Sequence, residues 1–232
     1  MISLEPARSI VKVLLFGASG MVGQGTLREC LLDPSVERVL SVGRSRTGIQ
    51  HPKLEELVVP ALPELSEFED RLGGYDACLF CLGVSSLGRT EAEYTRVTHD
   101  LTLEVARTLL RLNPTLVFEY VSGAGTDATE RGRSMWARVK GRTENELLRM
   151  PFRAAYMFRP GAIQPVHGVR SHTLAYRVVY VFVRPFLPIL LRWAPDSVTT
   201  SERMGRAMVR AARDGAATPR LETRDINELG RA

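Results

Sequence analysis

The sequence IVKVLLFGASGMVG, residues 10–23, joins an apolar run to three regularly spaced glycines. The run ends at Gly17, which is typical of a buried strand in a parallel sheet. The periodicity over Met21–Leu32 predicts a helix, and Asp33-Pro34 stops it. A strand, a glycine-rich turn and a helix in this order predict the start of an open α/β sheet.

The same alternation of strands and helices continues along the chain. Further strands are expected at Arg38–Val42, Leu54–Val59, Ala77–Leu82, Thr115–Val121 and Phe152–Phe158. Helices are expected at Glu91–Leu112, Arg133–Arg149 and Ser201–Arg213. This pattern predicts a doubly wound parallel sheet in a single domain, residues 1–232, with a small substrate-side subregion at about residues 161–200.

Composition sets the class of protein. The chain has 232 residues, 31 basic against 26 acidic side chains, a net charge of +5 and three cysteines. This favours one globular domain in a reducing, cytoplasmic compartment, without a disulfide framework. Cys78 and Cys81 lie in an apolar run and are interpreted as buried thiols rather than a redox or metal pair. No block of Lys or Arg occurs, so we expect no nucleic-acid partner.

One segment, Leu174–Trp193, is strongly apolar. It also contains Arg184 near its centre, together with two prolines, and an arginine at mid-bilayer costs roughly 3 kcal/mol or more. We therefore expect no transmembrane span. The preferred interpretation is a helix over a substrate pocket, and an oligomer face or a membrane-surface contact stays open as an alternative.

The three glycines have distinct physical roles. Gly17 permits a sharp turn out of the strand, Gly20 permits close approach of a pyrophosphate, and Gly23 permits tight packing of the helix on the sheet. The N-terminus of the helix then offers free N–H groups to phosphates. A merely structural tight turn is the alternative. The predicted dinucleotide contacts in this loop are Gly17, Ser19, Gly20, Met21, Val22 and Gly23.

The second predicted strand ends at Val42-Gly43-Arg44-Ser45-Arg46 and contains no Asp or Glu there. An acidic residue at this position usually binds the ribose hydroxyls of NAD, whereas an arginine suits the 2′-phosphate of NADP. We therefore predict NADP(H) as the preferred cofactor, with NAD(H) as the alternative, and Arg44 as the selecting residue. The alternative for Arg44 and Arg46 is a solvated loop.

The chain resembles the atypical branch of the short-chain dehydrogenase/reductase superfamily, with its Rossmann fold. The motifs are GASGMVG at residues 17–23, LFCLG at 79–83, YVSG at 120–123, Lys140, and FRPG at 158–161. Their order is similar to that of the tat-interactive oxidoreductase group and of bacterial proteins resembling NAD-dependent epimerases and dehydratases. The resemblance implies further cofactor contacts from Leu82, Gly83, Lys140, Pro160 and Gly161.

In that superfamily a Ser, a Tyr and a Lys carry catalysis, with the Tyr four residues before the Lys. Ser122 and Lys140 match two of them, so the resemblance implies that Ser122 holds a substrate oxygen and Lys140 the nicotinamide ribose. Trp136 stands at the position of the Tyr. An indole does not titrate near neutral pH, so it cannot pass a proton to an alkoxide as a phenol can. The candidate replacements for the proton donor are Tyr94, His167 and His172.

Other candidates for the pocket are weaker. Residues 164–173 are expected to pass over it, where Arg170 could hold a polar or anionic group, and Ser85 and Ser86 follow the fourth strand. The first functional hypothesis is an NADP(H)-binding oxidoreductase, or an epimerase- or dehydratase-like enzyme, for an unknown small carbonyl or hydroxyl substrate. The second is a catalytically weak or inactive NADP(H)-bound sensor or partner-binding protein. An oligomer is compatible with both.

Overall fold

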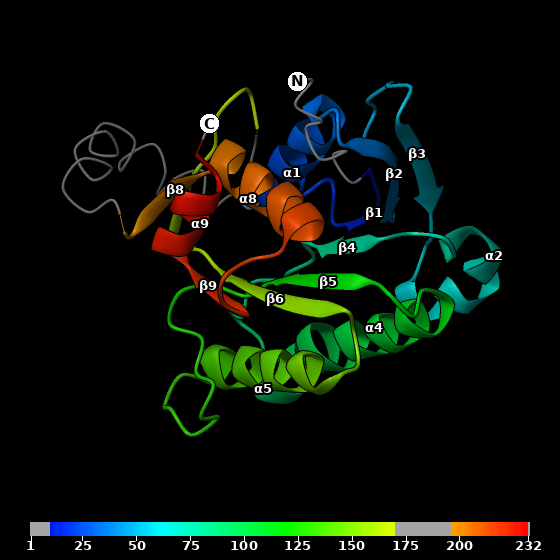
Figure 1. The fold of residues 1–232 in the computed structure, drawn as a ribbon. Coiled ribbons are helices and arrows are strands. Elements are labelled where there is room, and N and C mark those ends of the chain that lie inside the picture. The colour runs from blue at the N-terminus through cyan, green and yellow to red at the C-terminus, as the bar shows by residue number, and fades with distance from the viewer. Residues whose placement is uncertain (1–9, 170–195, 232) are drawn as a thin grey trace.

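The computed structural model describes residues 10–169 and 196–231, and Figure 1 shows their arrangement. Seven parallel strands form one sheet in the order β3-β2-β1-β4-β5-β6-β9. The strands are β1 (Val11–Phe16), β2 (Val36–Gly43), β3 (Leu54–Val58), β4 (Ala77–Phe80), β5 (Val117–Val121), β6 (Ala154–Arg159) and β9 (Arg220–Glu222). The predicted doubly wound parallel sheet is confirmed.

Helices cover both faces of the sheet, as Figure 1 shows with α4 and α5 on one side and α1 and α8 on the other. The helices are α1 (Met21–Leu32), α2 (Glu69–Leu72), α3 (Glu91–Thr95), α4 (Leu101–Leu112), α5 (Met135–Arg149), α8 (Ser201–Asp214) and α9 (Thr223–Leu229). Each face has its own apolar core. Leu109 of α4 and Leu147 of α5 belong to one core, and Leu27 of α1 and Met208 of α8 belong to the other.

Two glycines bring α1 and α8 into backbone contact. A β-carbon built on Gly25 would lie 2.5 Å from the carbonyl oxygen of Ser201, and one on Gly205 would lie 2.8 Å from that of Gly25. These distances leave no room for a side chain, so the two helices cross as closely as their backbones permit. The C-terminal part of the chain is thereby fixed against the helix that follows the glycine loop.

Several elements differ from the sequence prediction. The helix expected over Glu91–Leu112 is interrupted by a π-helical turn, η2 (Arg96–Asp100). The three-residue strands β9, β7 (Ala162–Gln164) and β8 (Val198–Thr200) were not predicted, because so short a run carries no period. β7 and β8 pair parallel to each other in a separate two-stranded sheet. A 3₁₀ helix, η1 (Leu62–Phe68), was also missed.

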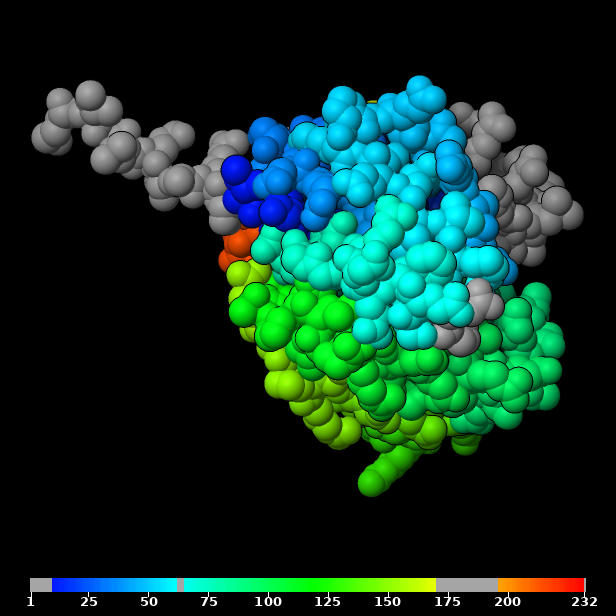
Figure 2. All heavy atoms as spheres, turned by 90° about the vertical axis from the view of Figure 1, so that its right-hand side faces the viewer, coloured from blue at the N-terminus to red at the C-terminus, as the bar shows by residue number. Residues whose placement is uncertain are grey.

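Charged side chains protect the edge strand β3 from pairing with another chain. Figure 2 shows the side of the molecule on which β3 and α2 lie, between the β1–β2 region and α4. Val58 of β3 is exposed there, and the neighbouring Glu55 lies close to the guanidinium groups of Arg38 and Arg71. Charged side chains on an edge strand discourage pairing with another chain.

The thiols and the apolar segment complete the comparison with the sequence. Cys78 is fully buried, and the Cys81 sulfur packs 3.9 Å from the Met208 sulfur, so both are thiols in apolar surroundings, as predicted. Burial raises the pKa of Cys81 to about 12. Leu174–Trp193 lies outside the described residues. Within residues 10–169 and 196–231, no helix has the length and apolarity to cross a membrane.

A buried carboxyl group in the sheet generates a prediction about stability. Glu119 of β5 is fully buried, and neither of its side-chain oxygens has a hydrogen-bond partner. Burial raises the pKa of Glu119 well above its usual value, so the native state keeps this proton above the unfolded-state pKa of about 4.3.

We predict that Glu119→Leu raises the free energy of unfolding by about 1–3 kcal/mol, because it removes an unsatisfied polar group from the core. The gain should be larger at pH 8 than at pH 5, since raising the pH favours ionisation of Glu119 in the unfolded state only. Urea unfolding at both pH values measures this. Glu119→Gln, the matched control, should remove the pH dependence without the full gain. A Glu119→Leu protein no more stable than the original at either pH contradicts the prediction.

Candidate functional site

The glycine loop lies where the order of the sheet reverses. From β1 the chain builds β2 and β3 on one side, and then returns to place β4, β5 and β6 on the other side of β1. In open α/β sheets, ligands bind outside the carboxyl ends of the strands at such a reversal. The turn after Phe16 opens at this point, with the end of β4 beside it.

The loop is as tight as its three glycines suggest. Gly17 has φ +82°, and a β-carbon there would lie 2.9 Å from the backbone of Cys81 and Leu82. The Gly20 N–H donates to the Gly17 carbonyl over 2.9 Å. A β-carbon on Gly23 would lie 2.0 Å from the same carbonyl oxygen, so α1 packs directly on the turn. Strand, turn and helix thus form one rigid unit.

The start of α1 is suited to an anion. Its N-cap is Gly20, no side chain caps its N–H groups, and its first turn contains no acidic residue. Ser19, Met21 and Val22 flank this N-terminus. The uncapped N–H groups and the positive end of the helix dipole are the chemistry that binds a pyrophosphate. The residues present therefore fit a dinucleotide.

The end of β2 presents free positive charge. Arg44 and Arg46 are exposed, and neither forms an ion pair with another described residue. The nearby carboxylate of Glu56 is engaged by its own loop, because it accepts from the Thr47 N–H over 2.6 Å and from the Thr47 hydroxyl over 2.7 Å. No carboxylate from this loop therefore competes for Arg44.

The other residues predicted to contact the cofactor follow the ends of strands β4 and β6. Leu82 is half-buried beside Gly17, and a β-carbon on Gly83 would meet nothing within 4 Å, so this backbone is open. Pro160 is held by its carbonyl, which accepts from the Ala124 N–H over 2.8 Å. The Gly161 N–H donates to the Thr223 hydroxyl over 2.8 Å, so this donor is already used within the protein.

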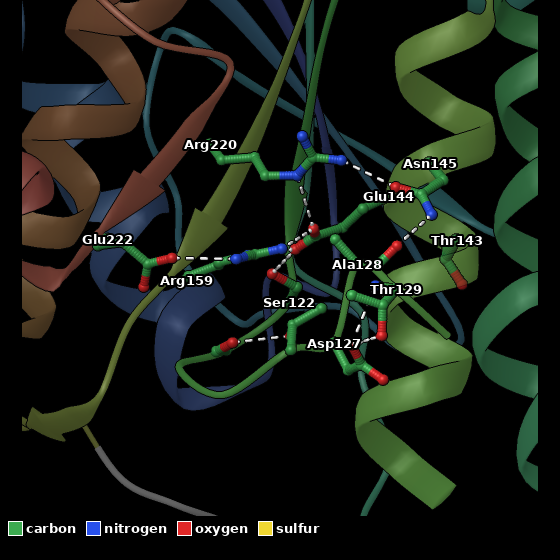
Figure 3. Close-up of polar contacts among 12 residues, drawn as sticks. Ser122, Asp127, Ala128, Thr129, Thr143, Glu144, Asn145, Arg159, Arg220 and Glu222 are labelled. Carbon is green, nitrogen blue, oxygen red and sulfur yellow. Dashed lines mark hydrogen bonds and ion pairs between the residues drawn. The ribbon is translucent and has the colours of Figure 1, made fainter. Parts of the chain in front are cut away.

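Ser122, at the end of β5, points into the protein. It is buried, and its hydroxyl lies 2.6 Å from a carboxylate oxygen of Glu144 (Figure 3). The same hydroxyl lies 3.1 Å from the carbonyl oxygen of Phe158. Both partners are acceptors, so the single hydroxyl proton is directed inward. In this arrangement Ser122 has no second proton to donate to a ligand.

Glu144 is the centre of a buried polar network that sequence reasoning missed. Its carboxylate is fully buried and accepts from Arg159 of β6, over 2.9 Å from Nε and 2.5 Å from Nη2. Arg220 of β9 adds a longer contact of 3.3 Å from its Nε (Figure 3). Arg159 also reaches Glu222 over 3.0 Å. The only signal in the sequence was a glutamate one helical turn after Lys140.

Lys140 of α5 is half-buried, and its ammonium donates to the backbone carbonyl of Ser122. It forms no ion pair with any carboxylate in the described part of the chain, including Glu144 one turn away. Desolvation lowers the pKa of Lys140 to about 8, although the Glu144 charge opposes this shift. Lys140 is therefore a cation close to losing its proton at neutral pH.

The indole of Trp136 lies against the loop that follows β5. A β-carbon built on Gly125 would lie 3.6 Å from Trp136 Cη2, so the ring covers this glycine. Trp136 is half-buried at the start of α5, one turn before Lys140. The structure thus brings Ser122, Trp136 and Lys140 to the same strand end, two strands from the glycine loop. At about 4.8 Å per strand, that is a separation of about 10 Å.

The structure places the other candidate residues in different surroundings. Tyr94 is only 2% exposed, and burial raises its pKa, so its phenol belongs to the core. His167 is on the loop after β7, where Nε2 lies 3.3 Å from a Glu202 oxygen. Ser85 is exposed and caps its own loop by accepting from the Leu87 N–H over 3.2 Å, and Ser86 remains beside it. His172 and Arg170 lie outside the described residues.

Sequence comparison identifies relatives in the predicted group. The chain is 29% identical over 160 residues to protein fmp52-1, mitochondrial, of Aspergillus terreus, covering 66% of this chain and 67% of the relative. It is 26% identical over 153 residues to protein HTATIP2 of Rattus norvegicus, covering 65% of this chain and 62% of the relative. The matches thus span about two thirds of each relative's length. No model of a protein family matches the chain.

Solved structures show the same fold. A short-chain dehydrogenase/reductase family oxidoreductase from Burkholderia thailandensis superposes with a TM-score of 0.65, at 16% identity, over 92% of this chain and 91% of that one. The ADP-L-glycero-D-manno-heptose-6-epimerase of Helicobacter pylori gives 0.65, at 12% identity, over 97% and 83%. WbmF of Bordetella bronchiseptica, in complex with NAD+ and UDP, gives 0.62 at 13% identity, over 95% and 76%.

The fold is that of the short-chain dehydrogenases/reductases and related epimerases. The chain is also similar in sequence to HTATIP2 and to the fmp52 proteins, which confirms the predicted resemblance to the atypical short-chain dehydrogenases/reductases. The prediction of a cytoplasmic location is contradicted, because the fungal fmp52 relatives are named as mitochondrial proteins.

The glycine loop generates a prediction about two neighbouring alanine substitutions. Gly23→Ala should cost about 3 kcal/mol of stability, because its β-carbon would overlap the Gly17 carbonyl oxygen. Gly20→Ala is the matched control: its β-carbon would lie 3.4 Å from that oxygen, so the cost should stay below about 1 kcal/mol. Urea unfolding compares them, and equal losses of stability would show that the loop is not packed as described.

Proposed function

We propose that the protein binds NADP(H) in the glycine loop and reduces a small carbonyl compound, or oxidises the corresponding alcohol. The observation that carries the proposal is the turn at Gly17–Gly23, which directs an uncapped helix N-terminus at the reversal point of the sheet. The NAD+ bound to WbmF, which has the same fold, supports a nicotinamide dinucleotide as the ligand class.

The preference for NADP(H) over NAD(H) rests on Arg44. This arginine follows β2, is exposed and has no carboxylate partner among the described residues. A guanidinium forms two parallel, charge-assisted hydrogen bonds to a phosphate, and the end of β2 contains no Asp or Glu for the ribose hydroxyls of NAD. The same loop contains Arg46, which adds positive charge near the 2′-phosphate.

The chemistry of the reacting end rests on Lys140. When bound, the dinucleotide supplies or accepts the hydride, and the protein must deliver or take up the proton. The Trp136 indole cannot do so near neutral pH, and the Ser122 proton faces Glu144. The Lys140 ammonium uses one of its three N–H groups to donate a hydrogen bond to the Ser122 carbonyl, which leaves two N–H groups for other acceptors. We assign it the role of proton donor, with Trp136 as a wall of the pocket.

A second candidate is a protein that holds NADP(H) without rapid turnover and acts as a sensor or partner-binding protein. The inward direction of the Ser122 hydroxyl favours it, because this strand-end hydroxyl is then not available to polarise a substrate carbonyl. The two candidates share the cofactor and differ only in the chemical step.

The cofactor assignment predicts a change in selectivity. We expect the original protein to bind NADPH more tightly than NADH, and Arg44→Ala to weaken NADPH binding by about 10- to 100-fold while leaving NADH binding unchanged, since only NADPH has the 2′-phosphate. Isothermal titration calorimetry measures both ligands. Arg107→Ala, an exposed arginine on α4, is the control and should change neither. Equal affinities in the original protein would rule out the role of Arg44.

The proton donor predicts a pH profile. With 4-nitrobenzaldehyde as a carbonyl probe, NADPH oxidation should fall as the pH rises through about 8, because the Lys140 ammonium then loses its proton. Trp136→Tyr should raise the rate, since a phenol at this position provides an additional proton donor, and general acid catalysis is typically worth about 10²–10⁴-fold. If neither protein oxidises NADPH while both bind it, the non-catalytic candidate is correct.

A further inference from the structure

The buried network around Glu144 contains more positive than negative charge. Its single fully buried carboxylate contacts two guanidinium groups, those of Arg159 and Arg220, as Figure 3 shows. Glu222 contacts Arg159 from a position that is half in solvent. Lys140 adds a further cation one turn along α5. Glu144 is therefore shared among more cations than it can neutralise.

The missing ion pair between Lys140 and Glu144 follows from this competition. Residues four apart on a helix lie on one face, and a lysine and a glutamate at this spacing commonly interact. Here the Glu144 oxygens are taken by Arg159 from β6, by Arg220 from β9 and by the Ser122 hydroxyl from β5. The carboxylate is held on the sheet side of α5, and the Lys140 ammonium bonds a backbone carbonyl instead.

We propose that Arg220 is a positioning residue for Lys140, which with Arg159 holds the Glu144 carboxylate away from the ammonium and so leaves its proton free to be transferred. The proposal rests on the role given to Lys140 under the proposed function. It assigns a part in the site to β9, a strand 80 residues further along the chain than Lys140.

Arg220 is better suited to this test than Arg159. Arg159 is 12% exposed and binds both Glu144 and Glu222, so its removal leaves a buried carboxylate nearly unpaired. Arg220 is 34% exposed and makes one long contact to Glu144 and one of 2.8 Å to the Asn145 side-chain oxygen. Replacing Arg220 therefore removes one positive charge from beside the Glu144 carboxylate, with little change in packing.

The elements α3 and β5, which contact α5, also carry titratable groups. The phenols of Tyr94 and Tyr120 are buried, and burial raises the pKa of both, so they stay neutral throughout the range of the test. From β6 and β9 the charged groups are Arg159, Arg220 and Glu222. Glu144 is thus the anion closest in sequence to Lys140 on its own helix, and its charge raises the lysine pKa.

The chain has only three lysines, Lys12, Lys53 and Lys140, which makes the test direct. In protein labelled with 13C at lysine, NMR titration of the side-chain carbons gives a pKa for each, and Lys140→Met assigns the signal. We expect Arg220→Gln to raise the pKa of Lys140 by about one unit, because the Glu144 charge then acts more strongly on the ammonium, and Glu144→Gln to lower it. Arg220→Lys should restore most of the original value.

Two comparisons separate charge from loosening of the fold. Arg224→Gln removes an exposed arginine of α9 that pairs with Glu228, and should leave the Lys140 pKa unchanged. In the Glu144→Gln background, Arg220→Gln should lose most of its effect, whereas a looser fold would raise the lysine pKa in both backgrounds. If Glu144→Gln does not fold, Arg220→Gln against Arg220→Lys makes the same comparison.

The outcomes distinguish this proposal from the proposed function. If Lys140 titrates near the ordinary value of about 10.4 in the original protein, its role as proton donor is wrong and the proposal falls with it. If Lys140 titrates low and Arg220→Gln leaves it unchanged, the proposal about Arg220 alone is wrong. A rise in the pKa that depends on Glu144 supports it.

Discussion

A single buried carboxylate ties together the strand ends on which the candidate site depends. Glu144 of α5 joins Ser122 of β5, Arg159 of β6 and Arg220 of β9, and an ionised group with no exposed surface persists only when its oxygens are satisfied in this way. Because α5 also bears Trp136 and Lys140, the position of both follows from this anchor. The network fixes the relative positions of these elements but adds little to the free energy of unfolding, because the attraction within a buried ion pair is largely offset by the cost of its desolvation.

The glycine loop has a different physical origin, because it depends on excluded volume rather than charge. The backbone contacts at Gly17 and Gly23 admit no side chain, so the turn has one conformation and leaves the start of α1 uncapped. The crossing of α1 and α8 at Gly25 and Gly205 extends this close packing to the C-terminal helix. Two rigid parts, the glycine loop and the Glu144 network, thus lie two strands apart at the carboxyl ends of the strands of one sheet.

The sequence predicted what local patterns encode. The first six strands of the chain and the long helices α1, α4, α5 and α8 follow from apolar periodicity, and the turn at Gly17–Gly23 follows from glycine spacing. The π-helical turn at Arg96–Asp100 and the short strand β9 have no such local signal. The inward direction of Ser122 was equally invisible, because it depends on Glu144 and on arginines that reach it from β6 and β9. Long-range polar pairing cannot be derived from spacing along one chain.

The proposed dinucleotide site is the claim on which the proposed function rests, and tryptophan fluorescence tests it most directly. The chain has two tryptophans, and Trp136 lies at the strand end where the nicotinamide ring is expected. Titration with NADPH should quench tryptophan emission in a saturable way, with energy transfer to the nucleotide, and Trp136→Phe should remove most of the effect. The absence of any change in fluorescence or heat with NADPH and with NADH would contradict the account.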